Sequence, residues 1–195
     1  MNVTAGIGVL SQASPMSQDL FPGRITAGIA GGFVGLLSIA NMLGRFGWSS
    51  FSDFIGRKAT YLVFFLLGPL LYVAIPASGR TQSVALFAFA CFVILSMYGG
   101  GFATIPAYLR DLFGTRQVGA IHGRLLTAWS AAGIVGPALV SYIGQYQTNH
   151  GVPKAHQYDL TMYIMAGLLL IGLICDLLVR PVDAKHHEID APVTG

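Results

Sequence analysis

Apolar residues occur along the chain in five long blocks that short polar segments separate. An α-helix needs about 17–25 mainly apolar residues to cross the hydrocarbon core of a bilayer, and each block has a length in that range. The pattern therefore predicts an all-α integral membrane protein, with a five-helix transmembrane bundle within residues 15–180. The five predicted spans are residues 25–47, 60–77, 84–107, 125–143 and 160–179.

Composition supports a membrane location. Of the 195 residues, 54% are hydrophobic and only 10% are charged, whereas soluble domains carry about 25% charged residues. So few charges cannot cover a water-facing surface. Both cysteines, Cys91 and Cys175, lie inside predicted spans and have no metal-binding spacing. We therefore predict two buried apolar thiols, with no metal site and no cofactor.

The two ends of the chain do not fit the pattern of the spans. Residues 1–14 begin with an apolar run that is too short to span and lacks the basic segment of a signal peptide. We interpret them as the end of a truncated transmembrane helix. Residues 181–195 are polar and charged, and we predict a disordered cytoplasmic tail. Its neighbouring His186 and His187 indicate a solvated tail rather than a metal site.

Basic residues predict the orientation, because cytoplasmic loops are enriched in Lys and Arg. Seven basic residues flank the spans on one side and three on the other, so the tail is predicted to be cytoplasmic. The net charge of +3 is scattered over loops, which gives no basic patch for a nucleic-acid partner. The seven are Arg57, Lys58, Arg110, Arg116, Arg124, Arg180 and Lys185; the three are Arg24, Arg80 and Lys154.

The spans are rich in glycine, and the chain has 25 glycines in all. Small residues at helix interfaces let membrane helices approach closely. We therefore predict close contacts at the glycines of the first and third spans and at those before the fourth. These are Gly31, Gly35, Gly99, Gly100, Gly101, Gly119 and Gly123.

Polar residues recur at helical spacing from the first span into the segment that follows it. Their intervals of 3, 4, 4 and 3 residues put them on one face of a helix with 3.6 residues per turn. The other faces are mostly apolar. A polar stripe is unfavourable against lipid, so it is predicted to face protein or a water-filled cavity. The stripe consists of Ser38, Asn41, Arg45, Ser49 and Ser52.

Arg45 is the one ionisable residue within the first span. It precedes Asp53 by eight residues, about 12 Å along a helix, and so lies not far from the centre of a hydrocarbon layer about 30 Å thick. A cation there costs at least about 2.5–3.5 kcal/mol. Arg45 either extends to the cytoplasmic edge or pairs with a helix carbonyl, or it binds an anion on a translocation path. We favour anion binding on a translocation path, because the planar guanidinium suits a carboxylate.

Other ionisable groups give weaker signals. Asp176, near the end of the last span, is a candidate for proton coupling, but a pair with Arg180 one turn later is the simpler interpretation. No nucleophile with a neighbouring base and no glycine-rich phosphate loop is visible in the sequence. The chain is therefore predicted not to be an enzyme.

Residues 53–58, DFIGRK, resemble the cytoplasmic loop signature G-x-x-x-D-[RK]-x-G-[RK]-[RK] of the major facilitator superfamily. Ser49 stands in place of the leading glycine, and Phe54 in place of the basic residue after the aspartate. The signature latches the cytoplasmic side closed in that superfamily. The resemblance therefore implies that Asp53, Arg57 and Lys58 form a conformational latch.

Residues 99–137, GGGFATIPAYLRDLFGTRQVGAIHGRLLTAWSAAGIVGP, are similar to the oxalate/formate antiporter family within that superfamily. With NVTAGIG and GRFGWSSFSD, the similarity covers nearly the whole chain except the tail. It implies that residues 1–14 end the seventh helix and that the five spans are helices eight to twelve. The chain would then be the C-terminal six-helix half of a carrier, without the N-terminal six-helix half.

The resemblance also implies a binding site. Arg45 matches the arginine that contacts the substrate carboxylate in the oxalate exchangers, whereas Trp129 stands where those exchangers have a lysine. It implies a secondary carrier of small carboxylates, by antiport or proton symport, in the plasma (bacterial inner) membrane. Asn41, Tyr98 and Trp129 would line the pocket with Arg45, and one cation favours a monocarboxylate. The alternative is a non-transporting membrane subunit or receptor-like remnant of a carrier.

Overall fold

The computed structural model describes residues 1–182, which form six α-helices and one short 3-10 helix. Five of the α-helices, α2 to α6, are long and apolar enough to cross a membrane. The elements are α1 (Asn2–Leu20), α2 (Ala27–Ile55), α3 (Arg57–Arg80), α4 (Val84–Phe113), α5 (Val118–Asn149), η1 (Lys154–His156) and α6 (Asp159–Leu178).

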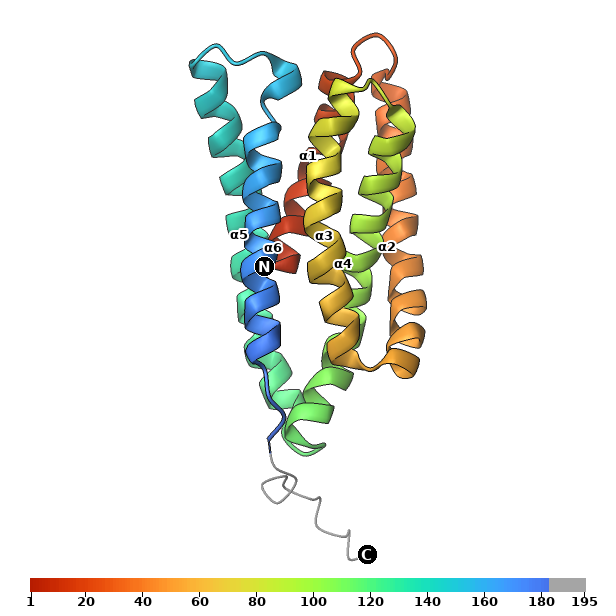
Figure 1. The fold of residues 1–195 in the computed structure, drawn as a ribbon, viewed down its shortest axis with the longest axis vertical. Coiled ribbons are helices and arrows are strands. Elements are labelled where there is room, and N and C mark those ends of the chain that lie inside the picture. The colour runs from red at the N-terminus through yellow and green to blue at the C-terminus, as the bar shows by residue number, and fades with distance from the viewer. Residues whose placement is uncertain (183–195) are drawn as a thin grey trace, which may run out of the picture.

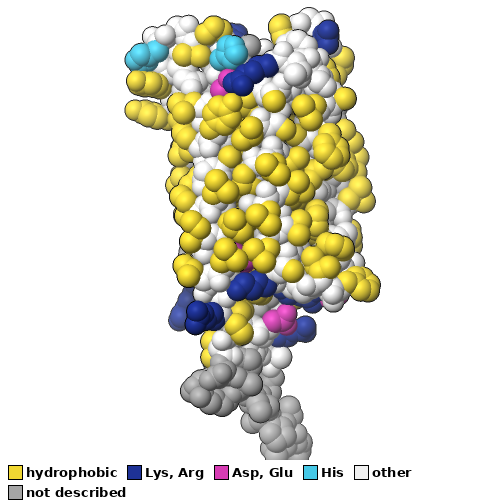
Figure 2. Space-filling view, in the orientation of Figure 1, with side chains coloured by type: hydrophobic (Ala, Val, Ile, Leu, Met, Phe, Trp, Pro, Cys, Tyr) yellow, Lys and Arg dark blue, Asp and Glu magenta, His cyan; other side chains and the backbone are white. Residues whose placement is uncertain are grey.

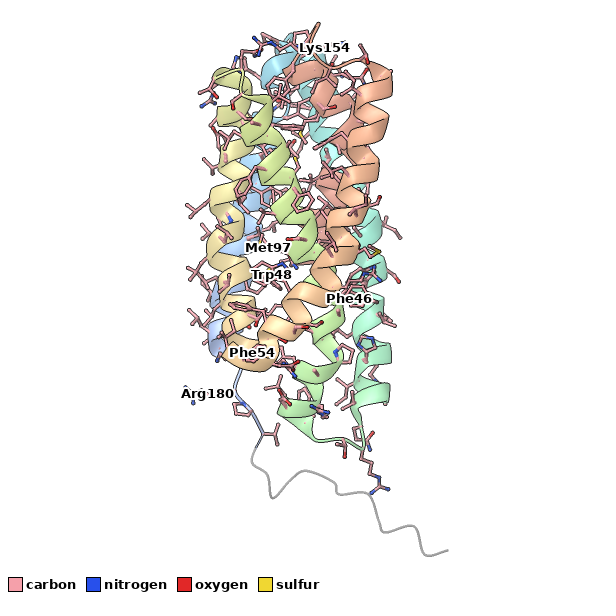
Figure 3. All side chains as sticks on the ribbon, turned by 90° about the vertical axis from the view of Figure 1, so that its right-hand side faces the viewer. Phe46, Trp48, Phe54, Met97, Lys154 and Arg180 are labelled. Carbon is pink, nitrogen blue, oxygen red and sulfur yellow. The ribbon has the colours of Figure 1, made fainter. Side chains whose placement is uncertain are left out.

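The helices lie side by side along the long axis of the bundle (Figure 1). The α2–α3 and α4–α5 connections and the end of α6 lie at one end, and the remaining connections lie at the other. On the face shown in Figure 2, charged side chains gather at these two ends, while a broad apolar belt covers the surface between them. Lys154 marks one end and Arg180 the other (Figure 3). Such an all-helical bundle satisfies its backbone groups within each helix, as a bilayer requires.

Local sequence explains where the helices begin and end. The Thr26 hydroxyl accepts a hydrogen bond from the amide of Ile29 at 3.4 Å, and Ser83 caps α4 in the same way. Such caps satisfy amides that lack a partner within the helix. Gly56 has φ +89° between α2 and α3, and Gly114 has φ +80° after α4. This left-handed region favours glycine, so both residues permit the sharp turns at this end of the bundle.

Helices α2 and α4 approach so closely that their backbones touch. A Cβ atom added at Gly44 would lie 2.0 Å from the carbonyl oxygen of Ser96, and one at Gly99 would lie 2.1 Å from that of Asn41. An added Cβ would also lie 2.4 Å from Trp48 at Gly100 and 2.8 Å from Asn2 at Gly101, so the predicted close packing at all three glycines of α4 is confirmed. Four other predicted contacts are wrong for this chain: Gly31, Gly35, Gly119 and Gly123 have open space beside them. Their helix faces meet no neighbouring helix within residues 1–182.

Polar contacts join the helices at the end of the bundle marked by Lys154. Arg80 of α3 pairs with Asp159 of α6 at 2.8 Å. The Tyr158 hydroxyl donates to the carboxylate of Asp19 in α1, also at 2.8 Å. Burial and the neighbouring Asp19 carboxylate raise the pKa of Tyr158 above its usual range. This phenol therefore stays a neutral donor at ordinary pH.

The five predicted spans are confirmed, and each helix is longer or shifted by a few residues at its ends. One predicted boundary needs correction. Helix α1 runs through Pro15 to Leu20, beyond the predicted limit of residue 14, because burial of Met16 and Leu20 stabilises the extra turn. The segment between the last two spans is helical up to Asn149 and again in η1. The predicted tail lies outside the described residues from position 183 onward.

Candidate functional site

A cavity of about 270 Å³ lies beside the middle of α2. Arg45 is ten residues before the end of α2, which corresponds to about 15 Å along the helix, or half the thickness of a hydrocarbon core of about 30 Å. The polar stripe on α2 supplies one wall, and α1 and α4 supply the others. The lining residues are Leu10, Leu37, Ser38, Asn41, Arg45, Leu95 and Tyr98.

The Arg45 side chain is held from two sides. Its Nε donates a hydrogen bond to Oδ1 of Asn41 at 3.2 Å, and its guanidinium carbon lies 5.2 Å from the centre of the Phe102 ring. A guanidinium over an aromatic face at this distance is attracted by the π-electrons. The terminal amino groups of Arg45 form no hydrogen bond with the described residues, and no carboxylate among them pairs with Arg45. They can therefore bind an incoming anion.

Two further aromatic rings extend this arrangement toward α5. The Trp129 ring meets the Phe102 ring edge to face, with centroids 4.6 Å apart, and lies 5.5 Å from the Tyr98 ring. Trp129 and Gly101 also line a second, partly open cavity of about 210 Å³, together with Tyr61 of α3. The arrangement places one fixed cation beside an apolar, aromatic wall.

The structure brings the predicted site residues into one neighbourhood. Arg45, Asn41 and Tyr98 line the same cavity, and Trp129 reaches it through its contacts with Tyr98 and Phe102. Sequence reasoning missed Phe102, although it follows Tyr98 by four residues, one helical turn. That spacing could have identified it, because the two side chains had to share a face of α4.

The predicted latch residues cluster at the end of α2. Arg57 contacts Oδ1 of Asp53 at 2.5 Å and donates to the Ser52 hydroxyl at 2.8 Å. Its Nε also faces Asp111 of α4 at 3.9 Å. Lys58 takes a different role: its Nζ donates to the carbonyl oxygen of Val179 at 2.7 Å. These contacts tie the start of α3 to the ends of α2, α4 and α6.

Asp176 does not form the pair with Arg180 that the simpler sequence interpretation favoured. Its side chain is buried, and its hydrogen-bond partner is the hydroxyl of Tyr108, at 3.5 Å. The reason is that Asp176 points into the bundle between α3 and α4, whereas Arg180 follows the end of α6 and is exposed.

Comparisons with known proteins agree with this architecture. Residues 2–195 match the family described as the Major Facilitator Superfamily. The chain is also similar to a Bacillus subtilis (strain 168) protein described as the uncharacterized MFS-type transporter YddS, with 26% identity over 183 residues. That alignment covers 91% of this chain but 39% of the relative. The chain thus spans about two fifths of the length of this relative.

Proposed function

Because the chain belongs to the Major Facilitator Superfamily, we propose that it is the C-terminal half of a secondary carrier that moves small carboxylates across a membrane. Arg45 carries this proposal. It lies near the middle of a membrane-spanning helix, and its terminal amino groups have no partner within residues 1–182. A cation at that depth costs at least about 2.5–3.5 kcal/mol. A carboxylate substrate, bound by both terminal amino groups, offsets this cost.

The surroundings of Arg45 support a substrate with one negative charge. Two carboxylates buried away from water need two countercharges, and the cavity beside α2 holds a single cation. Trp129 donates one hydrogen bond and offers an apolar face, but it cannot neutralise a charge. We therefore propose a monocarboxylate of the formate, lactate or pyruvate type over oxalate.

The cluster of Asp53, Arg57 and Lys58 supports a latch in the same carrier. Its contacts connect the ends of four helices at one end of the bundle. That end carries most of the basic residues, which favours a cytoplasmic location. We propose that these contacts hold the helix ends together in one state of the carrier and separate when the site opens to the other side, in a plasma or bacterial inner membrane.

Substrate competition tests the proposal in a twelve-helix carrier that contains this chain as its C-terminal half. Monocarboxylates should inhibit uptake of a labelled monocarboxylate far better than oxalate does. Trp129→Lys should shift the preference toward oxalate, because it adds the second cation. A Tyr142→Lys variant, whose exposed side chain lies outside the cavity, should leave the preference unchanged. Better competition by oxalate in the unmodified carrier would refute the single-charge argument.

A further inference from the structure

Asp176 is a buried carboxyl group that the proposed site does not use. It lies in the last turn of α6 and is 6% exposed. The Tyr108 hydroxyl donates to Oδ1 at 3.5 Å, a long hydrogen bond, and Oδ2 is buried without any hydrogen-bond partner. An ionised carboxylate left in this way costs free energy, whereas a protonated carboxyl group does not carry the uncompensated charge.

Few groups face Asp176 from the helices packed against it. Helix α3 contributes Lys58 and the hydroxyl of Tyr61, and α4 contributes the hydroxyl of Tyr108. From the start of α1, the amino group of Met1 interacts electrostatically with Cys175, the residue before Asp176. Within residues 1–182, Lys58 is therefore the side-chain cation that could compensate an ionised Asp176.

Lys58 is engaged elsewhere in this structure. Its Nζ donates to the carbonyl oxygen of Val179 at 2.7 Å and lies 3.4 Å from that of Leu177. These oxygens belong to the C-terminal end of α6, which carries the negative end of the helix dipole. The helix end and the Asp176 carboxylate thus compete for one ammonium group. Here the helix end holds it.

Tyr108, which contacts Asp176, connects this carboxyl group with two cavities. Tyr108 lines a cavity of about 510 Å³ together with Lys58, at the end of the bundle that we assign to the cytoplasm. The Tyr108 ring stacks on the Tyr61 ring with centroids 5.4 Å apart. Tyr61 in turn lines the partly open cavity that Trp129 also lines. Contacts through Tyr108 and Tyr61 therefore connect Asp176 both with the cytoplasmic end and with the cavity lined by Trp129.

We propose that Asp176 is a proton-binding site, and that its protonation determines whether Lys58 stays on the end of α6. A hydronium ion transfers a proton to a carboxylate oxygen, so that one O–H bond of the hydronium breaks, one O–H bond forms on Asp176, the carboxylate charge disappears and neutral water is left; the reverse step returns the proton to water. Lys58 then remains on the α6 carbonyl oxygens, as in this structure. When the proton leaves, Lys58 moves to the carboxylate and releases the end of α6. The consequence for transport, coupling of a proton to carboxylate movement, rests on the function proposed above.

Infrared spectroscopy tests proton binding on the 195-residue chain itself, reconstituted in lipid discs. The carbonyl stretch of a protonated carboxyl group should be present at neutral pH and should disappear in Asp176→Asn. Asp176→Glu should restore such a band, and Tyr108→Phe should shift it, because the hydrogen bond is lost. Asp111→Asn is the matched control: its side chain is 50% exposed and lines the same cavity as Lys58, so the band should not change. A band that survives in Asp176→Asn, or no band in the unmodified chain, would overturn the proposal.

A second measurement tests coupling in the twelve-helix carrier in sealed vesicles. A pH gradient should raise uptake of a labelled carboxylate in the unmodified carrier. In Asp176→Asn, the ratio of uptake with the gradient to uptake without it should fall to one, while Asp176→Glu should keep a ratio above one. A ratio that stays above one in Asp176→Asn would overturn the assignment. Failure of the unmodified carrier to move any carboxylate would refute the proposed function and leave the infrared result to decide proton binding.

Discussion

The contact between α2 and α4 allows a quantitative prediction at Gly99. In Gly99→Ala, the new Cβ would lie 2.1 Å from the carbonyl oxygen of Asn41 and 2.9 Å from its carbonyl carbon. Ordinary contacts between non-bonded heavy atoms are about 3.5–4.0 Å. The neighbouring atoms are backbone, which cannot rotate away, so the two helices must separate by more than about 1 Å. Overpacking of this kind costs about 1–3 kcal/mol.

Thermal unfolding of the purified chain would measure this cost through exposure of Cys91, which is fully buried in α4. Cys175 is exposed, not buried as the sequence predicted, so it must be removed first. In a background that lacks Cys175, a thiol-reactive dye should label Cys91 at a lower temperature in Gly99→Ala. At about 2–4 °C per kcal/mol for a chain of this size, the expected decrease in Tm is several degrees. Gly35→Ala is the matched control, because a Cβ there meets nothing within 4 Å. An unchanged Tm in Gly99→Ala, or an equal decrease in Gly35→Ala, would refute the packing argument.

Two further predictions concern the ends of the bundle. The first concerns orientation and uses single cysteines in a chain without Cys175. A cysteine at the exposed His150 should react with an impermeant thiol reagent on intact cells, whereas one at the exposed Thr115 should not. The reverse pattern would overturn the predicted orientation. Tyr158 has a raised pKa in the folded chain, so its contribution to stability is present below about pH 10, the usual pKa of tyrosine, and is lost as pH rises toward its folded-state pKa. Stability measured by chemical unfolding should therefore fall less steeply above pH about 10 in Tyr158→Phe, and an unchanged slope would show that the pKa of Tyr158 is not raised by folding.

The hydrophobic pattern alone predicted the helices well. A helix in lipid satisfies its backbone hydrogen bonds internally and exposes its side chains to hydrocarbon, so each span needs a long apolar run that is visible in the sequence. Helix ends were predicted less well. The extension of α1 through Pro15 depends on burial of Met16 and Leu20 by other helices, which local sequence does not encode. The same limit applies to glycine: Gly44 and Gly35 look alike in sequence, yet only Gly44 touches the backbone of α4.

The candidate site was predictable to the extent that its residues lie on one helix. The intervals between Ser38, Asn41 and Arg45 fix a common face of α2, so their shared cavity follows from helical geometry. The contact of Arg45 with Phe102 depends on how α2 and α4 pack, and the sequence carries no direct sign of that register. Likewise, the place of Lys58 on the end of α6 joins residues 121 positions apart.

Binding of a monocarboxylate to variants of Arg45 tests the central claim most directly. The measurement is the Kd of a labelled monocarboxylate for the purified twelve-helix carrier that contains this chain. Arg45→Gln should abolish measurable binding. Arg45→Lys keeps the charge but loses the planar geometry. Loss of a charged hydrogen bond costs about 1.5–3 kcal/mol, so the Kd should rise by about 10- to 150-fold.

Arg24→Gln, at an exposed arginine that contacts the backbone of Gln82, should leave the Kd unchanged. Undiminished binding in Arg45→Gln would show that Arg45 is a structural cation and would contradict the assignment of the site.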